Sequence, residues 1–299
     1  MNTIGNATAA HYTRSTGQLA DLRRSAERMQ EQLATGERLA RASDNPVAAA
    51  RLRSLGRADR MAAVHRENAA RAAGDLQLAS EALGRIGDDL IRVRELAVQA
   101  GNGTLPAEAR EAIGLEIAQL RSGIIAAANT RDAYGNPLFA GEGAAAYTLS
   151  AAGDAAYAGT AEAGELDLGE GQSVKRGVTG PQFMTFASGG GQVDLPAFLK
   201  DLSETLQSGG GAGASIAALD DALDNLSRTQ TVVGARLAWV ETVQDRQVAA
   251  EEARAQATAD TGGVDFAATV ARLQQTLTAL EASQAGFARL SALSLFNSI

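Results

Sequence analysis

The chain has 299 residues, of which only 4% are aromatic, and its formal net charge is −8. This acidic balance argues against a general nucleic-acid binder, because neutralising phosphates requires a basic surface. Cysteine is absent, which excludes disulfides, thiolate catalysis and cysteine-based zinc sites.

Charge is spread unevenly along the chain. Residues 1–72 contain 12 arginines against 7 acidic residues, a net charge of +5, whereas the remaining residues have a net charge of −13. The basic segment either meets an acidic partner or forms an ordinary solvated helix face.

The sequence carries no signal for membrane insertion. No stretch approaches the roughly 20 apolar residues of a membrane span. The start, MNTIGNATAAHYTRS, lacks the basic-then-apolar pattern of a secretory signal. If the protein leaves the cell, we expect a route that needs no cleavable signal peptide.

The first predicted helix carries a coiled-coil stripe. Its apolar residues recur at alternating steps of three and four, which is typical of a helix that packs against a partner helix. Gly36 is expected to end this helix, because glycine is favoured just after a helix C-terminus. The stripe consists of Leu19, Leu22, Ala26, Met29 and Leu33.

A polar turn separates this helix from the next. Pro46 suits the first helical position because its φ is fixed, and Ser43, Asp44 and Asn45 offer side chains that cap free backbone N–H groups. The second helix is expected to run to Ala100, where the GNGTLP segment interrupts it. Its stripe consists of Leu76, Ala79, Leu83, Ile86, Leu90, Val93, Ala97 and Ala100.

After a third predicted helix, the sequence pattern changes from helical periodicity to turns and short alternating segments. The helix places Ile113, Ile117 and Ile124 on one face, and the next segment, NTRDAYGNPLFAG, is rich in turn residues. Residues 141–200 contain short alternating pieces such as YTLS, ELDLGEGQSVKRGV and QFMTFAS, which predict a small β-rich insertion. The glycine-rich runs SGGGQ and SGGGAGAS match no phosphate-binding loop and are interpreted as linkers.

Helix is predicted again from LPAFLKDLSETLQ onward. A longer helix keeps heptad spacing from Ile216 to Gln247, with Gln230, Gln244 and Gln247 in its seam. Polar seam residues are expected to weaken the packing while restricting its register.

The last predicted helix has an apolar face and an apolar end. Its face consists of Phe266, Val270, Leu273, Leu277, Leu280, Gln284 and Phe287, and the segment LSALSLFNSI follows. A soluble monomer does not normally expose such a cluster, so Leu293, Leu295 and Phe296 are expected to be buried by other subunits.

Neither terminal stripe can be buried by its own helix. We therefore expect residues 5–35 to pack against residues 264–296, with the middle helices forming a second bundle. The predicted fold is mainly α, an elongated helical bundle in which the N- and C-terminal helices form a coiled coil, with a small β-rich inserted domain. The expected parts are a terminal coiled-coil domain (1–40 with 264–299), a helical rod domain (41–140 with 201–263) and an outer inserted domain (141–200).

No residue constellation in the sequence indicates catalysis. The only histidines are His11 and His65, and neither an HExxH nor a GxSxG motif occurs. His65 lies at a weak heptad position, which favours the edge of a core over a metal ligand. Adjacent acidic residues such as Asp88 and Asp89 diverge by about 100° on a helix, so they do not converge on a substrate. We predict no catalytic, cofactor-binding or metal site.

Four segments carry a family resemblance. They are MQEQLATGERLARASDNPVAAARL, RVRELAVQAGNGTL, NTRDAYGNPLFAG and FARLSALSLFNSI. Together and in this order they closely resemble the flagellin-like hook-associated protein 3 family, the hook-filament junction proteins of the bacterial flagellum. The resemblance covers roughly residues 1–140 and 215–299.

The resemblance implies a non-enzymatic structural protein without a cofactor. Such a protein would be exported unfolded through the flagellar type III apparatus and would lie outside the cell, at the hook-filament junction. It would self-assemble into a ring that adapts hook-associated protein 1 to flagellin, and a flagellar export chaperone would bind its carboxyl-terminal helix. The candidate assembly-interface residues are Leu19, Leu22, Met29, Leu33, Leu273, Leu277, Leu280, Phe287, Leu290, Leu293, Leu295 and Phe296, and the inter-helix turn is Ser43, Asp44, Asn45 and Pro46.

The sequence departs from this family at three places. Relatives usually have an acidic residue where Asn45 stands, an aromatic or similar residue where Pro137 stands, and an acidic-aromatic ending where this chain has NSI. Because Asn caps a helix about as well as Asp, the helix start is expected to survive with the loss of one charge.

Three other interpretations compete with the junction protein. Flagellin itself would share the fold and the export route, but its turn and its apolar ending usually differ from SDNPVAA and SLF. An enzyme housed in the insertion would need a convergent pocket of perturbed polar residues. A signalling coiled coil is disfavoured because the sequence has neither a membrane span nor a sensor-like module.

Overall fold

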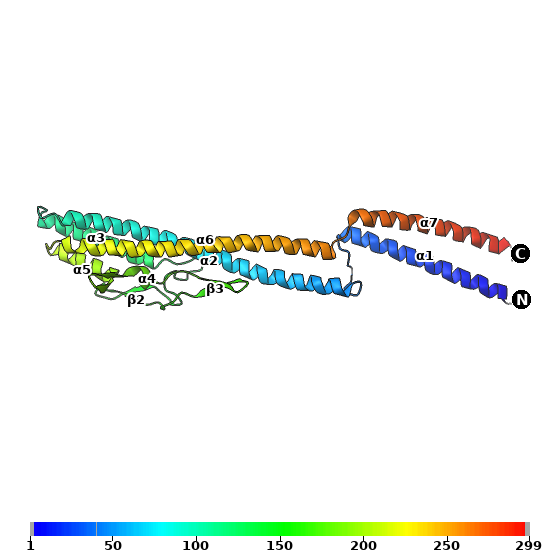
Figure 1. The fold of residues 1–299 in the computed structure, drawn as a ribbon, viewed down its shortest axis with the longest axis horizontal. Helices are drawn as coiled ribbons and strands as arrows, with labels where there is room; N and C mark the ends of the chain where they lie inside the picture. The colour runs from blue at the N-terminus through cyan, green and yellow to red at the C-terminus, as the bar shows by residue number, and fades with distance from the viewer. Residues whose placement is uncertain (1–2, 40, 297–299) are drawn as a thin grey trace. The chain divides into compact units, whose positions relative to one another are not determined.

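The computed structural model describes residues 3–39 and 41–296, with side-chain surroundings for residues 10, 12–39 and 41–289. Long helices make up most of the chain (Figure 1). The helices are α1 (Thr3–Thr35), α2 (Pro46–Ala100), α3 (Ala107–Ala128), α4 (Gly180–Met184), α5 (Leu195–Gln207), a short 3₁₀ helix (Gly213–Ser215), α6 (Ile216–Gly262) and α7 (Phe266–Phe296).

The strands form three separate antiparallel hairpins. In these hairpins Tyr147 pairs with Tyr157, Leu166 with Val174, and Phe186 with Val193. The predicted β-rich insertion is therefore confirmed as a set of small ribbons. The strands are β1 (Tyr147–Leu149), β2 (Ala155–Tyr157), β3 (Glu165–Gly169), β4 (Gln172–Lys175), β5 (Thr185–Ser188) and β6 (Gly191–Asp194).

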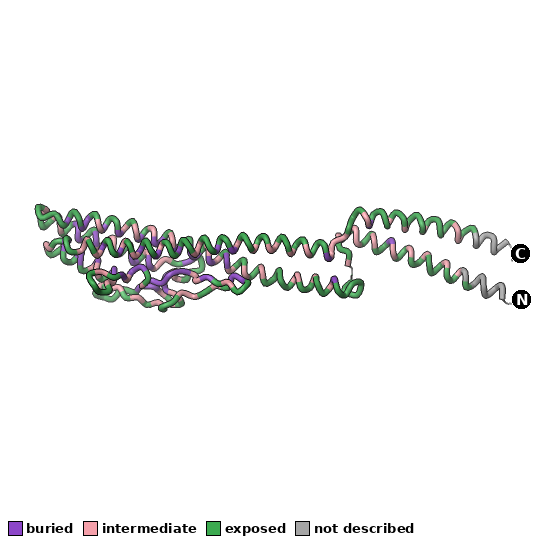
Figure 2. The backbone as a smooth tube through the Cα atoms, in the orientation of Figure 1, coloured by how far each residue is buried: buried purple, intermediate pink, exposed green. Residues whose placement is uncertain are grey.

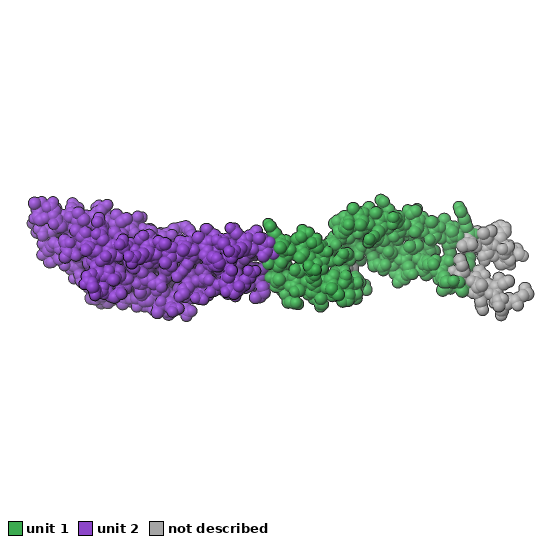
Figure 3. Space-filling model, in the orientation of Figure 1, with its two compact units in different colours: residues 1–60, 251–299 green, residues 61–250 purple. Residues whose placement is uncertain are grey.

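The chain divides into two compact units (Figure 3). The first unit combines residues 1–60 with residues 251–299, and the second consists of residues 61–250. In the first unit α1 packs along α7, as the two terminal stripes predict. The second unit holds the three hairpins, α3, α4 and α5, together with most of α2 and α6.

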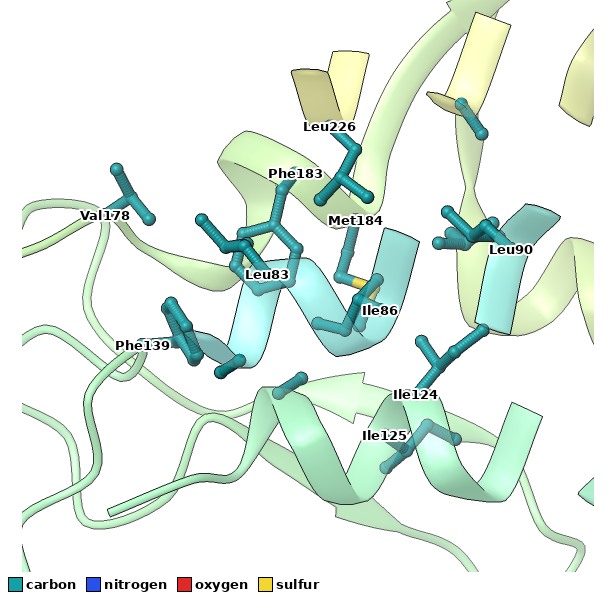
Figure 4. Close-up of a cluster of buried hydrophobic side chains, with 14 of the residues drawn as sticks. Leu83, Ile86, Leu90, Ile124, Ile125, Phe139, Val178, Phe183, Met184 and Leu226 are labelled. Carbon is teal, nitrogen blue, oxygen red and sulfur yellow. The ribbon is translucent and has the colours of Figure 1, made fainter. Parts of the chain in front are cut away.

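The core of the second unit lies where α2, α3 and α6 meet the insertion (Figure 2). All eight predicted stripe residues of α2 between Leu76 and Ala100 are buried. Phe139 from the NTRDAYGNPLFAG segment and Phe183 from the insertion are also fully buried, with an edge-to-face contact between rings whose centroids are 4.9 Å apart. Figure 4 shows these rings beside Leu83 and Ile86 of α2.

Two of the seam glutamines of α6 tie that helix to its neighbours. Gln230 donates its Nε2–H to the carbonyl of Leu83 in α2 at 3.2 Å, and Gln247 donates to the carbonyl of Leu168 in β3 at 2.9 Å. Buried amide side chains avoid a desolvation cost only when they find such partners. Each bond therefore favours one register of α6.

Two local predictions for the insertion were wrong. The residues QFM of QFMTFAS belong to helix α4, where Pro181 occupies one of the first helical positions, and the strand begins only at Thr185. The run SGGGQ is not a linker but the turn between β5 and β6, in which Gly189 and Gly190 take φ values of 59° and 85°. These positive φ values favour glycine and make the tight reversal possible.

Candidate assembly surface

The terminal helices pack through a narrow seam. Tyr12 of α1 and Phe287 of α7 meet edge to face, with ring centroids 5.2 Å apart and an interplanar angle of 82°. Ala26 and Thr269 are buried, with 5% and 7% of their surface exposed. Small residues at these positions allow the two backbones to approach closely.

Most of the predicted interface residues are only half-buried in this pair. Leu277 exposes 37% of its surface, and its neighbours Phe266 and Val270 on α7 expose 56% and 41%. The side chains of Leu290, Leu293, Leu295 and Phe296 lie outside the described residues. The half-buried predicted residues are Leu19, Leu22, Met29, Leu33, Leu273, Leu280 and Phe287. Two helices cover only part of these stripes, so an apolar surface remains for further helices.

The two connectors of the first unit are joined to each other. Gly36 follows α1 with a φ of 72°, the left-handed conformation that glycine adopts at a helix end. Its carbonyl accepts a hydrogen bond from the N–H of Val264, and the N–H of Arg38 donates to the carbonyl of Gly262 at 2.7 Å. Glu37 and Gly263 form the antiparallel bridge between these bonds. We call these residues, 36–38 with 262–264, the connector strap.

Arg38 extends the connector strap with its side chain. Its Nη2 donates to the carbonyl of Thr261 at 2.7 Å, near the end of α6. Carbonyls in the last turn of a helix lack intrahelical partners and carry partial negative charge, so a guanidinium suits this place. Sequence reasoning missed Arg38, since its partner is 223 residues away and neither motif nor periodicity links the two.

The polar turn before α2 is held by local hydrogen bonds. Asn45 caps the helix, because its Oδ1 accepts a hydrogen bond from the N–H of Ala48 at 3.1 Å. Asp44 accepts from the N–H of Arg41 at 2.8 Å, and α2 begins at Pro46. Ser43, Asp44, Asn45 and Pro46 are all exposed. The turn therefore begins the helix with local hydrogen bonds and leaves its polar side chains in reach of a neighbour.

The second unit contains a partly buried ionic network. Arg176, which follows β4, donates from Nε and Nη2 to Oδ2 of Asp75 on α2, at 3.0 and 2.9 Å. Its Nη2 also lies 3.3 Å from Oδ2 of Asp132. Oδ1 of Asp132 accepts from the backbone N–H groups of Tyr134 and Asn136. One arginine thus holds the insertion and the NTRDAYGNPLFAG turn to the long helix.

The two carboxyl groups of this network differ in pKa. Burial raises the pKa of Asp75 above its usual value, although Arg176 acts against the shift. Burial also acts to raise the pKa of Asp132, but hydrogen bonds from Asn136 and Tyr134 and the charge of Arg176 outweigh it and lower the pKa. Asp132 is therefore a fixed anion, while the charge of Asp75 depends on Arg176.

A cavity of about 310 Å³ borders Asp75 and Asp132. Enzymes place their catalytic polar groups in such cavities, so its lining tests the enzyme interpretation. Among the described residues that line it, the polar side chains are those of Glu67, Arg71, Asp75, Asp132 and Tyr134. This lining offers no serine, threonine or histidine to pair as nucleophile and base. Asp75 is bound by Arg176, and its raised pKa reflects burial rather than a role in catalysis.

The remaining residues considered for chemistry lie apart. His65 is half-buried, with Nε2 at 3.9 Å from Oδ2 of Asp167. Asp220 binds Arg94 in an ion pair, and burial followed by the charge of Asp88 raises the pKa of Asp89. Within the described chain, no group of three or more acidic or histidine side chains is placed to hold a metal ion. None of the described helices is long and apolar enough to cross a membrane.

Comparison with known proteins gives a consistent set of relatives. Residues 4–144 match the family described as the bacterial flagellin N-terminal helical region. The chain is 25% identical to flagellar hook-associated protein 3 of Escherichia coli (strain K12) over 287 residues, which cover 89% of this chain and 90% of that protein.

Solved structures share the fold. A crystal structure of FlgL from Xanthomonas campestris matches 69% of this chain and 99% of its own, with a TM-score of 0.62 and 18% identity. The flagellar junction protein FlgL from Legionella pneumophila matches 71% of this chain and 99% of its own, with a TM-score of 0.57 and 16% identity. The fold is therefore flagellin-like, mainly helical with small antiparallel hairpins.

Proposed function

We propose that this chain, which is similar to hook-associated protein 3 and carries a flagellin-type N-terminal helical region, is a structural subunit of the bacterial hook-filament junction. The observation that carries the proposal is the similarity to the Escherichia coli protein, which extends over nine-tenths of both chains. A match of this extent spans most of the chain.

The terminal helix pair supplies the physical basis for assembly. Those of its predicted interface residues whose side chains the structure describes are half-buried or exposed in the single chain, so added helices from neighbouring subunits would remove further apolar surface from water. Each square ångström of apolar surface buried contributes about 25 cal/mol. We infer self-assembly into a ring, with hook-associated protein 1 on one side and flagellin on the other.

The same surface also fits an export chaperone. A helix that presents an apolar stripe suits a groove lined with apolar residues, and α7 exposes Phe266, Val270 and Leu277. We propose that a flagellar export chaperone covers α7 before assembly. The chain would then be exported without a cleavable signal peptide and act outside the cell.

A deletion strain tests the junction function. Loss of this chain should leave hooks without attached filaments, and labelled protein expressed in the strain should appear in a few copies at the hook tip. Flagellin is the alternative, and it would instead label the whole filament. A deletion strain that still builds attached filaments of full length would refute the junction function.

A further inference from the structure

Two rows of unpaired charge lie on the helices α2 and α6. We call Arg53, Arg57, Arg60 and Val64 of α2 the basic row, and Glu241, Asp245, Val248 and Glu252 of α6 the acidic row. Both rows follow the spacing i, i+4, i+7, i+11, which places four residues on one face of a helix. All eight residues are exposed, and Val64 and Val248 expose 52% and 53% of their surface.

The charged side chains of these rows have no ion-pair partner within the described chain, although Nε of Arg53 donates a hydrogen bond to the carbonyl of Ala49 at 3.3 Å. Arg254 of α6 pairs with Asp59 of α2 through Nε and Oδ1 at 2.8 Å, so the facing sides of the two helices can neutralise each other. No ion pair in the described residues includes a member of either row. The uneven distribution of charge along the sequence therefore appears in the structure as a basic face on α2 and an acidic face on α6.

From this geometry we infer that the basic row of one copy docks on the acidic row of a second copy. The rows match in length, since each spans 12 residues or about 17 Å of helix. In an antiparallel alignment, Arg53 faces Glu252, Arg60 faces Asp245, and Arg57 lies over Val248. Val248 therefore lies between the two charged pairs, and Val64 lies over Glu241 at the end of the rows.

The contact is of the head-to-tail kind, because each copy offers both rows. Such contacts repeat around a ring when the rotation between copies closes. A single exposed ion pair contributes little, so the rows steer and orient copies that the terminal helices then hold. The inference deepens the proposed function and takes its biological setting from it.

Charge reversal tests the contact in solution. We expect the wild-type chain to self-associate at low salt, in sedimentation equilibrium, and to dissociate as salt shortens the screening length from about 30 Å to about 3 Å. The triple variants R53E/R57E/R60E and E241R/D245R/E252R should each associate roughly tenfold more weakly, as expected for the loss of two ion pairs. An equimolar mixture of the two should regain association, because each then meets an opposite row.

A matched control distinguishes an effect of the two rows from an effect of net charge alone. R51E/R85E/R228E makes the same change in net charge at exposed arginines outside the basic row and should leave association unchanged. The inference is overturned if this control weakens association as much as R53E/R57E/R60E does. It is also overturned if the wild-type chain does not associate at low salt, or if the mixture stays monomeric.

Cross-linking locates the contact directly. Because the chain contains no cysteine, a disulfide between copies can form only at introduced residues. Mild oxidation of R57C mixed with V248C should give the mixed dimer in excess over either homodimer, and its absence would contradict the alignment. A chain that passes these tests but fails to restore filaments in the deletion strain would contradict the proposed function alone.

Discussion

The ring of Phe287 in α7 meets the ring of Tyr12 in α1 edge to face, with 5.2 Å between centroids. This contact joins residues near opposite ends of the sequence. It also lies near the end of the part of the helix pair whose side chains the structure describes.

Replacing Phe287 by alanine is expected to loosen the terminal pair and leave the second unit intact. An aromatic pair contributes about 0.5–1.5 kcal/mol beyond the area it buries. Amide hydrogen exchange in residues 10–33 and 270–287 should accelerate. L277A, at a more exposed position of the same helix, should have less effect, and equal effects of the two variants would show that the ring contact is not special.

Removing residues 290–299 is expected to block assembly without unfolding the second unit. The deleted segment is LSALSLFNSI, whose apolar residues we expect other subunits to bury. Circular dichroism should show a retained thermal transition, while electron microscopy of the deletion strain should show bare hooks. Completed junctions built from the truncated chain would refute the burial of this segment.

Replacing Arg38 by alanine is expected to release one side of the connector strap. The substitution removes the bond from Nη2 to the carbonyl of Thr261 and should cost about 1 kcal/mol locally. Hydrogen exchange at residues 262–264 reports the change. Arg41 is the control, because its backbone N–H rather than its side chain makes the bond to Asp44. If R41A accelerates hydrogen exchange at residues 262–264 as much as R38A does, the side chain of Arg38 has no role in the connector strap.

Replacing Arg176 by methionine is expected to destabilise the second unit, and more so at neutral pH. Without Arg176, the carboxylates of Asp75 and Asp132 lose the positive charge that lowers the pKa of each. Raised folded-state pKa values confer stability that is present at low pH and lost as pH rises. The free energy of unfolding should fall by about 1–3 kcal/mol near pH 7, which is less than for a fully buried ion pair because Arg176 is partly exposed. Near pH 4 the fall should be smaller.

Urea titrations at several pH values measure this difference. R228M, which removes an exposed arginine of α6, should show little loss at any pH. The double variant D75N/R176M should recover part of the stability, since it removes the unpaired carboxylate. A loss that is independent of pH would mean that Arg176 acts through packing alone.

Replacing Gly114 of α3 by alanine is expected to lower the melting temperature. A Cβ atom there would lie 2.7 Å from the backbone carbonyl oxygen of Ser203 in α5, and such overpacking costs about 1–3 kcal/mol. Gly84 of α2 is the matched control, with nothing within 4 Å of its Cβ position. G84A should stabilise the helix by roughly 0.5–1 kcal/mol. A higher melting temperature in both variants would contradict the close approach of α3 and α5.

The helical part of the fold was predictable because its signals are local and repeated. Pro46 and Ala100 bound the second helix as predicted, and the stripe from Leu76 onward is buried throughout. The residues QFM were misread because a short helix of five residues leaves too few positions to show a period. The hairpin turn at Gly189 was misread because glycine serves both linkers and tight turns.

The assembly surface was only partly accessible from sequence. Heptad spacing selected the stripe of Leu19, Leu22 and Met29, and their half-burial follows from pairing with a single helix. Arg38 and Arg176 were not singled out, since each binds an atom that chain folding brings close from a remote position. The basic row lies within residues 1–72, whose net positive charge is visible in the sequence, but only the structure shows that its arginines form no ion pair within the described chain.

The connector strap limits how the chain can change in length. Its backbone bonds pair Gly36 with Val264 and Arg38 with Gly262 in a fixed register. A residue inserted into either connector would move each donor past its acceptor, so a deletion or insertion in one connector requires a compensating change in the other. The lengths of two segments more than 200 residues apart are thereby coupled, and indels should be tolerated in the glycine-rich SGGGAGAS run but not here.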